Sequence, residues 1–229
     1  MSAWSLGFHH ANAHGVLAAF HLVDGPEPVP ADVLARLPIE EQAFAATLRG
    51  YRQGQFVAGR FALRAACEQL GLNAPPLLPD DRGAPRLPAG WTGSISHKGD
   101  LAVGMVARAG QGRIGIDLED YGPPRPSIAR RILTPAELAL VEALPDERRW
   151  FAILIRFSVK EAIYKALDPY VRRYVGFDEA EVDLDPDGRA TVRLTLARGE
   201  GPFLAEARYE WLRGRLLASA RIRRPADVL

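Results

Sequence analysis

A six-residue stretch near the middle of the chain, Ile-Gly-Ile-Asp-Leu-Glu at 114–119, alternates between branched apolar residues and residues that are small or acidic. Successive side chains of a β-strand point to opposite faces, so Gly115, Asp117 and Glu119 share one face and the three apolar residues share the other. The stretch therefore predicts a strand with one apolar face and one face that carries two neighbouring carboxylates.

The first half of the chain is expected to combine helices with about three strands. The apolar run Val16–Val23 is typical of a buried strand, and the proline-rich residues 73–92 are typical of an extended loop. The remaining patterns predict helices over residues 31–50 and 52–70 and strands over residues 93–97 and 101–108.

The second half begins near Gly110 and has a similar mixture. Thr-Pro-Ala-Glu at 134–137 has the form of a capping box and predicts a helix that ends near Leu144, followed by a longer one from about Asp146 to Leu167. Strands are expected over residues 181–184, 190–197 and 203–222, with a turn at 212–214. We therefore expect an α+β fold of two similar-sized lobes, residues 1–111 and 112–229.

The overall charge argues against one class of function. With 29 basic and 28 acidic residues the net charge is +1, whereas proteins that bind nucleic acid in bulk usually carry a clear basic excess. The single cysteine, Cys67, is expected to be buried and inert. We see no secretory signal and no run of about 20 apolar residues that could span a membrane, and we expect a cytoplasmic monomer.

Asp117 and Glu119 are candidate ligands for a divalent cation. Hard cations such as Mg²⁺ take oxygen ligands, commonly one or two carboxylates completed by water and substrate phosphates. An isolated Asp-x-Glu is more often a solvated strand edge or a turn, so this pair alone leaves both interpretations open.

A second charged group lies on the expected helix, in Phe-Ser-Val-Lys-Glu-Ala-Ile-Tyr-Lys at 157–165. Glu161 and Lys165 are four residues apart and share a face, with Lys160 and Tyr164 in the adjacent row. Such a pair is most often a surface ion pair worth only about a few tenths of a kcal/mol. The apolar residues before it favour a partly buried face instead, where an idle ionic cluster is costly.

Two further groups could bind a phosphate. Ser96 and His97 follow a turn and could contact a phosphate or a purine, although a purely structural histidine is the alternative. Arg52 and Arg60 lie eight residues apart on nearly the same helical face, and Arg64 continues the row. Arginines grouped in this way suit a terminal phosphate, and an exposed helix face is the alternative.

Two apparent signals point elsewhere and carry little weight. Gly-Gln-Gly-Arg-Ile-Gly at 110–115 matches the dinucleotide-binding pattern, but it leads into the expected strand instead of opening a helix. No nearby acid or cysteine completes a metal site with His9, His10 and His14, which we assign to a loop or a solvated face. The sequence also lacks the P-loop pattern, which makes a P-loop enzyme an unsuitable interpretation.

The order of these segments resembles that of the 4′-phosphopantetheinyl transferases. Ser-Ile-Ser-His at 94–97, Gly-Ile-Asp-Leu-Glu at 115–119 and the stretch 157–165 follow one another as in the surfactin and enterobactin type. Further likeness to the enterobactin branch lies in Gln55–Arg60, Arg82–Trp91 and Tyr174–Ala180. The resemblance covers about residues 52–180 and implies two pseudo-symmetric halves, each a small antiparallel sheet packed with helices.

The family moves the 4′-phosphopantetheine arm of coenzyme A onto a serine of an apo carrier protein and releases adenosine 3′,5′-bisphosphate. The resemblance implies that the first lobe binds the 3′-phosphate and adenine, and that the second holds Mg²⁺ and the catalytic residues. The metal ligands would be Asp117, Glu119 and Glu161. The residues that bind coenzyme A would be Arg52, Arg60, Gly83, Ala84, Pro85, Ser96, His97, Lys160 and Lys165.

The resemblance favours Glu161 as general base for the acceptor serine, with Glu119 as the competing assignment. Lys165, with Lys160 nearby, would neutralise the leaving phosphate. Phe157 stands where the surfactin branch has tryptophan, so ligand contact there is expected to differ.

The resemblance also indicates partners. They would be carrier domains of polyketide, nonribosomal peptide or fatty-acid synthases, and we expect the acceptor to dock near residues 120–135. Two alternatives are a metal-dependent hydrolase of nucleotide pyrophosphates and a non-catalytic module that binds carrier proteins.

Overall fold

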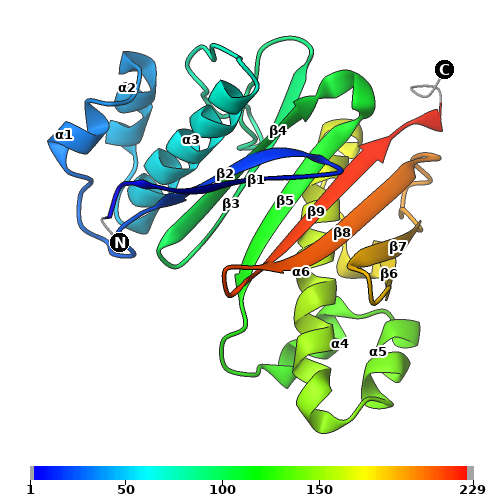
Figure 1. Cartoon of the computed structure of the whole chain (residues 1–229). Coiled ribbons are helices and arrows are strands. Elements are labelled where there is room, and N and C mark those ends of the chain that lie inside the picture. Colours follow the sequence, from blue (N-terminus) through cyan, green and yellow to red (C-terminus); the bar gives the residue numbers. More distant parts are fainter. Residues whose placement is uncertain (1–2, 226–229) are drawn as a thin grey trace. The chain divides into compact units, whose positions relative to one another are not determined.

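The computed structural model describes residues 3–225, and the chain divides into two compact units, Met1–Gly110 and Gln111–Leu229. In each unit a long helix packs against an antiparallel sheet, as Figure 1 shows element by element. The expected α+β class is confirmed. None of the helices in the described residues is long and apolar enough to cross a membrane.

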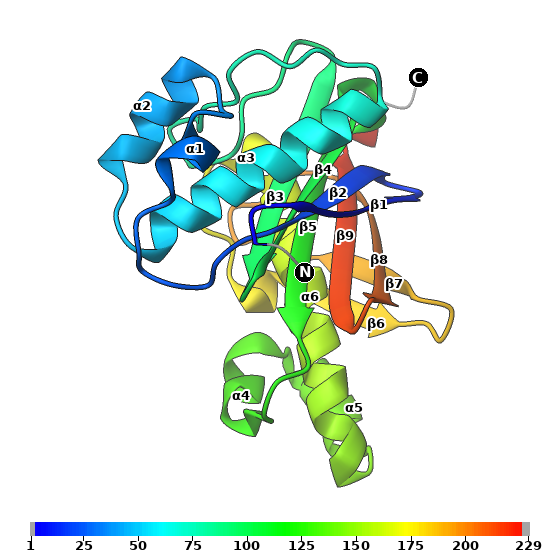
Figure 2. The same cartoon turned by 60° about the vertical axis from the view of Figure 1, so that its left-hand side comes forward.

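The first unit contains a four-stranded antiparallel sheet in the order β1-β2-β4-β3. Its strands are β1 (Leu6–Asn12), β2 (Gly15–His21), β3 (Trp91–Lys98) and β4 (Leu101–Arg108). Its helices are α1 (Ala31–Leu34), α2 (Ile39–Thr47) and α3 (Tyr51–Gln69). Figure 2 shows α3 lying across the strands of this sheet, where Val57, Ala62 and Leu63 are buried.

Two sequence expectations in this unit need correction. The helix expected over residues 31–50 is two short helices, because α2 starts directly after Pro38, whose fixed φ suits a helix start and not a helix interior. β1 was not expected at all. The loop assignment is therefore wrong for His9 and His10, since both lie on this strand and pair with β2, although His9 is exposed as on a solvated face. His14 does lie in the connecting turn, but it is buried.

The second unit contains a five-stranded antiparallel sheet in the order β5-β9-β8-β7-β6. Its strands are β5 (Arg113–Asp120), β6 (Ala180–Leu184), β7 (Arg189–Leu194), β8 (Leu204–Leu212) and β9 (Arg215–Arg223). Its α-helices are α4 (Ala129–Ile132), α5 (Pro135–Glu142) and α6 (Asp146–Val171). Short 3-10 helices are η1 (Ala109–Gln111), η2 (Pro126–Ile128) and η3 (Phe177–Glu179).

The capping box predicted at 134–137 is present, with the Glu137 backbone N–H donating to Thr134 Oγ1 and the Thr134 N–H donating to the Glu137 carboxylate. α6 is longer than expected and continues through Pro169 to Val171, where Arg172 ends it in the left-handed conformation. The predicted turn at 212–214 joins β8 to β9. The strand expected over residues 190–197 ends earlier than predicted, because β7 stops at Leu194.

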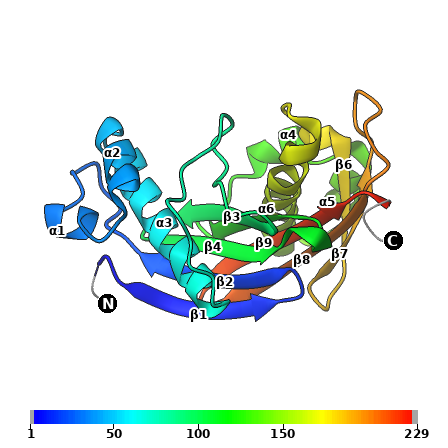
Figure 3. The ribbon, with the colours of Figure 1, turned by 90° about the horizontal axis from the view of Figure 1, so that it is seen from above.

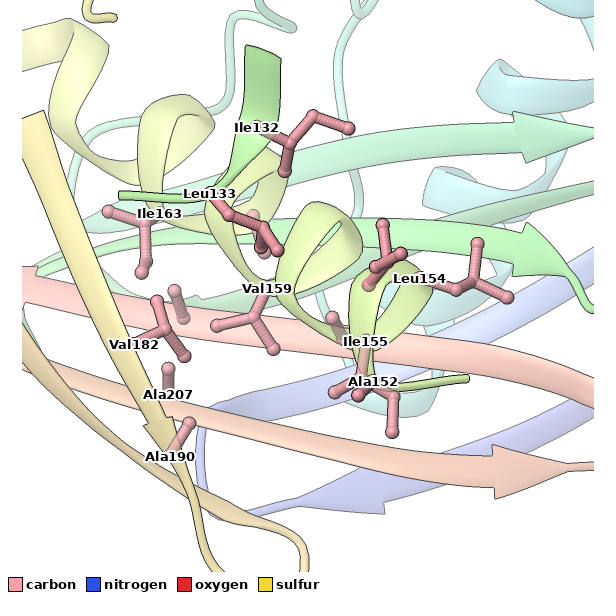
Figure 4. Packing of buried hydrophobic residues seen from close by; sticks show 14 of the residues in the cluster. Ile132, Leu133, Ala152, Leu154, Ile155, Val159, Ile163, Val182, Ala190 and Ala207 are labelled. Carbon is pink, nitrogen blue, oxygen red and sulfur yellow. The ribbon is translucent and has the colours of Figure 1, made fainter. Parts of the chain in front are cut away.

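α6 forms the core of the second unit by packing along the sheet. Figure 4 shows Ile155, Val159 and Ile163 of this helix facing small or branched residues of the strands, among them Val182 and Ala207. All five of these side chains are at most 5% exposed. Burial of this apolar stripe fixes the rotation of α6 about its axis, and hence the direction of its polar residues.

The two units share an internal order of elements. In the first, β2 precedes α3 and then pairs with β4, the second strand of the hairpin that follows. In the second, β5 precedes α6 and then pairs with β9, again the second strand of a hairpin. Each unit adds strands of its own, β1 in the first and β6 and β7 in the second, so the symmetry is approximate.

The segment between α3 and β3 has no helix or strand, as expected, but the loop predicted over residues 73–92 ends earlier because β3 begins at Trp91. Figure 3 shows it as a long excursion from α3 before the chain re-enters the sheet at β3. Inside it, a tight turn over residues 80–85 is held by an isolated bridge between Pro79 and Pro85. The turn is therefore ordered by its own contacts even though it lies outside the regular elements.

Candidate active site

Gly115 allows α6 to approach β5 closely. A Cβ atom placed on Gly115 would lie 1.9 Å from the backbone oxygen of Ala162, far inside van der Waals contact. Since alternate residues of β5 share a face, Asp117 and Glu119 lie on this same side of the sheet. The strand register supports this, because their partners on β9, Ala218 and Leu216, belong to the core packed around α6.

Asp117 is joined to α6 by both of its carboxylate oxygens. Its Oδ1 accepts a hydrogen bond from Lys165 Nζ at 2.8 Å, and its Oδ2 accepts one from Ser158 Oγ at 2.8 Å. Lys165 also donates to the backbone oxygen of Ile116 at 2.9 Å. Asp117 is buried while Lys165 is partly exposed, so the lysine ammonium is the charge of this pair that solvent can reach.

Glu161 lies one helical turn before Lys165 and is half-buried. Burial raises the pKa of its carboxyl above the usual range, and the neighbouring negative charges of Asp117 and Glu119 raise it further, while Lys165 opposes them. The structure thus brings Asp117, Glu119, Glu161 and Lys165 within electrostatic range of one another, as the sequence predicted. Their mutual repulsion is the kind of strain that a bound cation relieves.

These carboxylates are not gathered into a preformed cage. Among residues 3–225 we find no group of three or more His, Cys, Asp or Glu side chains that could hold a metal ion as it stands. Mg²⁺ does not require such a group, since it is usually bound through one or two carboxylates and completed by water and substrate phosphates. The donor chemistry of Asp117, Glu119 and Glu161 therefore fits Mg²⁺ only together with a phosphate ligand.

Lys160 lies in the protein interior. It is 0% exposed, and its ammonium donates to the backbone oxygens of Ile132 and Phe177 at 2.8 Å and to Glu137 Oε2 at 2.7 Å. An ammonium has three donors, and all three are used. The contact with a phosphate that the resemblance implied for Lys160 does not fit this environment.

Glu137 completes the same buried network. Its Oε1 accepts the Val182 N–H at 2.7 Å, and its Oε2 accepts both the Thr134 N–H and the Lys160 ammonium at 2.7 Å. One carboxylate thus ties α5, α6 and β6 together. A structural role for Lys160 and Glu137 follows from these contacts.

In the first unit, Arg60 is the most unusual of the predicted phosphate ligands. It is 4% exposed, its guanidinium lies 4.4 Å from the centre of the Phe56 ring, and its Nε has no hydrogen-bond partner within the described residues. Burial lowers its pKa to about 10, although the charge of Glu41 partly opposes this. A buried guanidinium with an unused donor is expensive unless an anion binds to it.

Arg64 follows Arg60 on α3, but its guanidinium is hydrogen-bonded within the protein. Its guanidinium donates to Glu41 Oε1 at 2.6 Å and to the backbone oxygens of Ala74 and Pro75. Glu41 is itself 0% exposed and also accepts the Leu77 N–H. Arg64 is thus committed to holding the loop after α3, and the continuation of the arginine row that the sequence suggested does not extend to it.

Arg52, Ser96 and His97 are more dispersed than the sequence implied. Arg52 is exposed in the first turn of α3, about 12 Å along the helix axis from Arg60. Ser96 and His97 are neighbours on β3, so their side chains point to opposite faces of the sheet. His97 is exposed on the face of Ile95, which contacts α3 at Gly59, whereas Ser96 is buried on the other face.

Gly83, Ala84 and Pro85 belong to the ordered turn after α3. Asp80 Oδ1 accepts the N–H groups of Arg82 and Ala84, and the Asp80 N–H donates to the Ala84 oxygen at 2.8 Å. Gly83 has a φ of +90°, a conformation that favours glycine. The turn therefore presents a fixed backbone surface.

Two residues of this site were not singled out from the sequence. Ser158 lies three residues before Glu161, and this helical spacing combined with a hydroxyl group was the only available signal. Glu137 was identified only as part of a capping box. Its bond to Lys160 joins residues 23 positions apart and could not be read from local spacing.

Comparison with known proteins identifies the family. Residues 113–219 match the model of the 4′-phosphopantetheinyl transferase superfamily, and residues 40–107 match that of the 4′-phosphopantetheinyl transferase N-terminal domain. The chain is 37% identical over 202 residues to the 4′-phosphopantetheinyl transferase Svp of Streptomyces mobaraensis, covering 82% of this chain and 77% of that protein.

Two further relatives agree with this match. The 4′-phosphopantetheinyl transferase PptT of Mycobacterium tuberculosis is 33% identical over 187 residues, covering 78% of this chain and 81% of that protein. Enterobactin synthase component D of Salmonella typhi is 33% identical over 135 residues, covering 57% of this chain and 54% of that protein. The chain belongs to the 4′-phosphopantetheinyl transferase superfamily, is an enzyme of that class, and is of the type to which enterobactin synthase component D belongs.

Proposed function

We propose that this enzyme transfers the 4′-phosphopantetheine group of coenzyme A to a serine hydroxyl of an apo carrier protein in a Mg²⁺-dependent reaction that releases adenosine 3′,5′-bisphosphate. The observation that carries the proposal is the approach of α6 to β5 at Gly115. It gathers Asp117, Glu161 and Lys165 from segments more than 40 residues apart.

The proposed metal ligands are Asp117, Glu119 and Glu161. They supply oxygen donors only, as Mg²⁺ prefers, and they require substrate phosphate to complete the coordination. When bound, Mg²⁺ supplies charge neutralisation for the pyrophosphate.

Glu161 is the proposed general base. Its pKa is raised by burial and by the charge of Asp117, which makes it a better proton acceptor than an ordinary carboxylate. The serine oxygen forms a new bond to the β-phosphorus of coenzyme A as its proton passes to Glu161. The phosphoanhydride bond breaks, and its electron pair leaves on the phosphate of adenosine 3′,5′-bisphosphate. Glu119, the competing base, is also half-buried on β5.

Lys165 is the proposed partner of the leaving phosphate. Its ammonium is 32% exposed by side chain and donates to Asp117, so it can turn toward an incoming anion without leaving the cluster. Lys160 has no part in this step, because its three donors bind interior acceptors.

In the first unit, Arg60 is the proposed centre of the 3′-phosphate site. Its buried guanidinium has a donor available, and a dianionic phosphate would compensate the charge. Arg52 and His97 are exposed and would reach the phosphate from the edge of the site. The ordered turn at Gly83, Ala84 and Pro85 would meet the adenine. Ser96 stays a proposed ribose contact, from the opposite face to His97.

The acceptor is proposed to dock on the segment after β5, over residues 120–135. Tyr121 opens this segment and forms an exposed aromatic cluster with Phe151 and Trp211. These three side chains are 43%, 37% and 38% exposed. Tyr121 follows Glu119, a proposed metal ligand, by two residues, so this cluster begins close to the proposed metal site. Exposed aromatic groups of this kind are typical of protein contacts.

The test is to incubate the protein with coenzyme A, Mg²⁺ and a panel of apo carriers from polyketide, peptide and fatty-acid synthesis, and then to weigh each carrier. We expect a mass gain of one phosphopantetheine that disappears when the metal is chelated. No gain on any carrier would refute the proposal.

The same experiment separates the alternatives. A nucleotide pyrophosphate hydrolase would release phosphopantetheine to water without a carrier, which product analysis would detect. The non-catalytic carrier-binding module is excluded by membership of an enzyme class.

A further inference from the structure

We propose that Ser158 is a positioning residue for the metal site, and that its hydroxyl orients the Asp117 carboxylate toward the cation. This inference deepens the proposed Mg²⁺-dependent function and rests on it. Ser158 is 0% exposed on α6, and its Oγ lies 2.8 Å from Asp117 Oδ2.

The direction of this hydrogen bond is informative. A serine in a helix commonly donates its hydroxyl to the carbonyl one turn back in the same helix. Ser158 instead donates across to β5, to a residue 41 positions away in the sequence. A hydroxyl has one hydrogen to donate, so its use on Asp117 links the helix directly to the acidic strand.

Asp117 is thereby held by two donors from α6. Ser158 and Lys165 are seven residues apart, which is close to two helical turns, so they lie on one face of the helix. Long helical side chains lean toward the N-terminus, and Lys165 reaches back to Oδ1 while the short Ser158 side chain meets Oδ2 directly. One donor on each oxygen fixes the plane of the carboxylate.

Fixing that plane matters for a cation. A cation approaches a carboxylate along a lone-pair direction of its oxygens, so the orientation of the Asp117 carboxylate decides where the cation can bind. Lys165 is partly exposed and is shared between Asp117 and the proposed phosphate, whereas Ser158 is wholly buried and donates to Asp117. Ser158 is therefore the donor whose hydrogen bond to Asp117 does not depend on the phosphate.

The experiment uses Mn²⁺ as a spectroscopic substitute for Mg²⁺. Free Mn²⁺ is titrated by electron paramagnetic resonance against the full-length protein, with and without saturating coenzyme A. We expect Ser158→Ala to weaken Mn²⁺ binding about tenfold, in the range typical for the loss of a residue that orients a metal ligand, and Ser158→Thr to restore most of it. Circular dichroism melting shows whether each variant is folded.

Ser219→Ala is the matched control. Ser219 is also a buried serine of the second unit, at 1% exposure, but it pairs with Ile116 and so lies on the other face of the sheet from Asp117. Its substitution should leave Mn²⁺ affinity unchanged.

The outcomes separate this inference from the function on which it rests. If the wild-type protein binds Mn²⁺ and folded Ser158→Ala binds it equally well, the positioning role is refuted and the metal site stands. If Ser158→Thr is folded but as weak as Ser158→Ala, packing and not the hydroxyl is responsible, which also refutes it. If the wild-type protein binds no Mn²⁺ in either condition, the metal site itself fails and this inference fails with it.

Discussion

The surroundings of Lys160 in the second unit and those of Arg60 in the first compensate a buried cation to different degrees. In the second, Lys160 is bound to Glu137, and Arg173 is bound to both Glu179 and Glu200. In the first, Glu41 and Arg64 form a comparable pair, but Arg60 is buried with its Nε unbonded. Within the described residues, buried guanidinium Nε atoms without a hydrogen-bond partner also occur in the second unit, among them those of Arg156 and Arg223. The contrast is therefore between Lys160 and Arg173, whose charges are paired, and Arg60, whose Nε is unbonded.

This difference separates charges that maintain structure from charges that await a ligand. A buried pair with all its hydrogen bonds made is stable in place, and removing one partner leaves the other uncompensated. A buried cation without an anion costs free energy that a bound phosphate would recover. In the second unit, Glu161 resembles Arg60 in this respect. Burial and neighbouring negative charges raise the pKa of Glu161, whereas hydrogen bonds from Arg173 lower the pKa of Glu179.

Glu161 provides the largest expected effect. Glu161→Gln keeps the shape of the side chain but removes the proton acceptor, so we expect the transfer rate to fall about a thousandfold, within the range for loss of a general base. Thermal melting should be unchanged or slightly higher, because a neutral group replaces a partly buried charge. Carrier modification followed by mass spectrometry measures the rate. A near-normal rate would transfer the role of base to Glu119.

The Lys160–Glu137 pair should give the largest loss of stability. Lys160→Met leaves the Glu137 carboxylate buried without its counter-charge, and we expect the free energy of unfolding to fall by about 3–5 kcal/mol. Urea unfolding followed by circular dichroism measures it. The double variant Lys160→Met with Glu137→Gln should recover part of the loss. If Lys160→Met were as stable as wild type, the distinction between charges that maintain structure and charges that await a ligand would be wrong.

Arg60 should show the opposite pattern. Arg60→Met removes a buried cation whose Nε is unbonded, so the free energy of unfolding should stay the same or rise by about 1 kcal/mol. The KM for coenzyme A should rise about tenfold, as for the loss of one charged phosphate contact. Arg64→Met is the control on the same helix, and it should lower stability because Glu41 is then left unpaired. A loss of stability in Arg60→Met without a change in KM would contradict this assignment.

The smallest effect concerns pH. Hydrogen bonds from Arg173 lower the pKa of Glu179 to about 2, below the ordinary value of 4.5. A depressed carboxyl pKa stabilises the folded state above the ordinary value, and this contribution is lost as the pH falls from about 4.5 toward 2. Arg173→Met should therefore flatten the acid side of the stability profile, which urea midpoints at about pH 6 and about pH 3 would show. An unchanged slope would mean that other carboxyls dominate.

Much of the fold could be predicted because its signals are local. Alternation in 114–119 predicted β5, and the capping box at 134–137 predicted the start of α5. β1 could not be predicted in this way, since Leu-Gly-Phe-His-His-Ala-Asn has no regular alternation and its pairing with β2 supplies the order.

The site shows the same division. Helical and strand spacing placed Glu161 with Lys165 and Asp117 with Glu119. It could not show that Lys160, next to Glu161 in the sequence, faces the interior, because that depends on the carbonyl groups of Ile132 and Phe177 and on Glu137. Nor could it separate Arg60 from Arg64, whose difference is set by Glu41 on another helix.

The close contact between Gly115 and the backbone of Ala162 fixes how near α6 lies to β5, and therefore how near the reactive side chains lie to one another. The Ala162 oxygen lies where a methyl group on residue 115 would have to be, so any side chain there would move α6 away from β5. Such a shift would draw Ser158, Glu161 and Lys165 away from Asp117 in one step. The distance between the chemical groups is thus determined by a residue that has no chemical group of its own, and a survey of reactive side chains alone would overlook it.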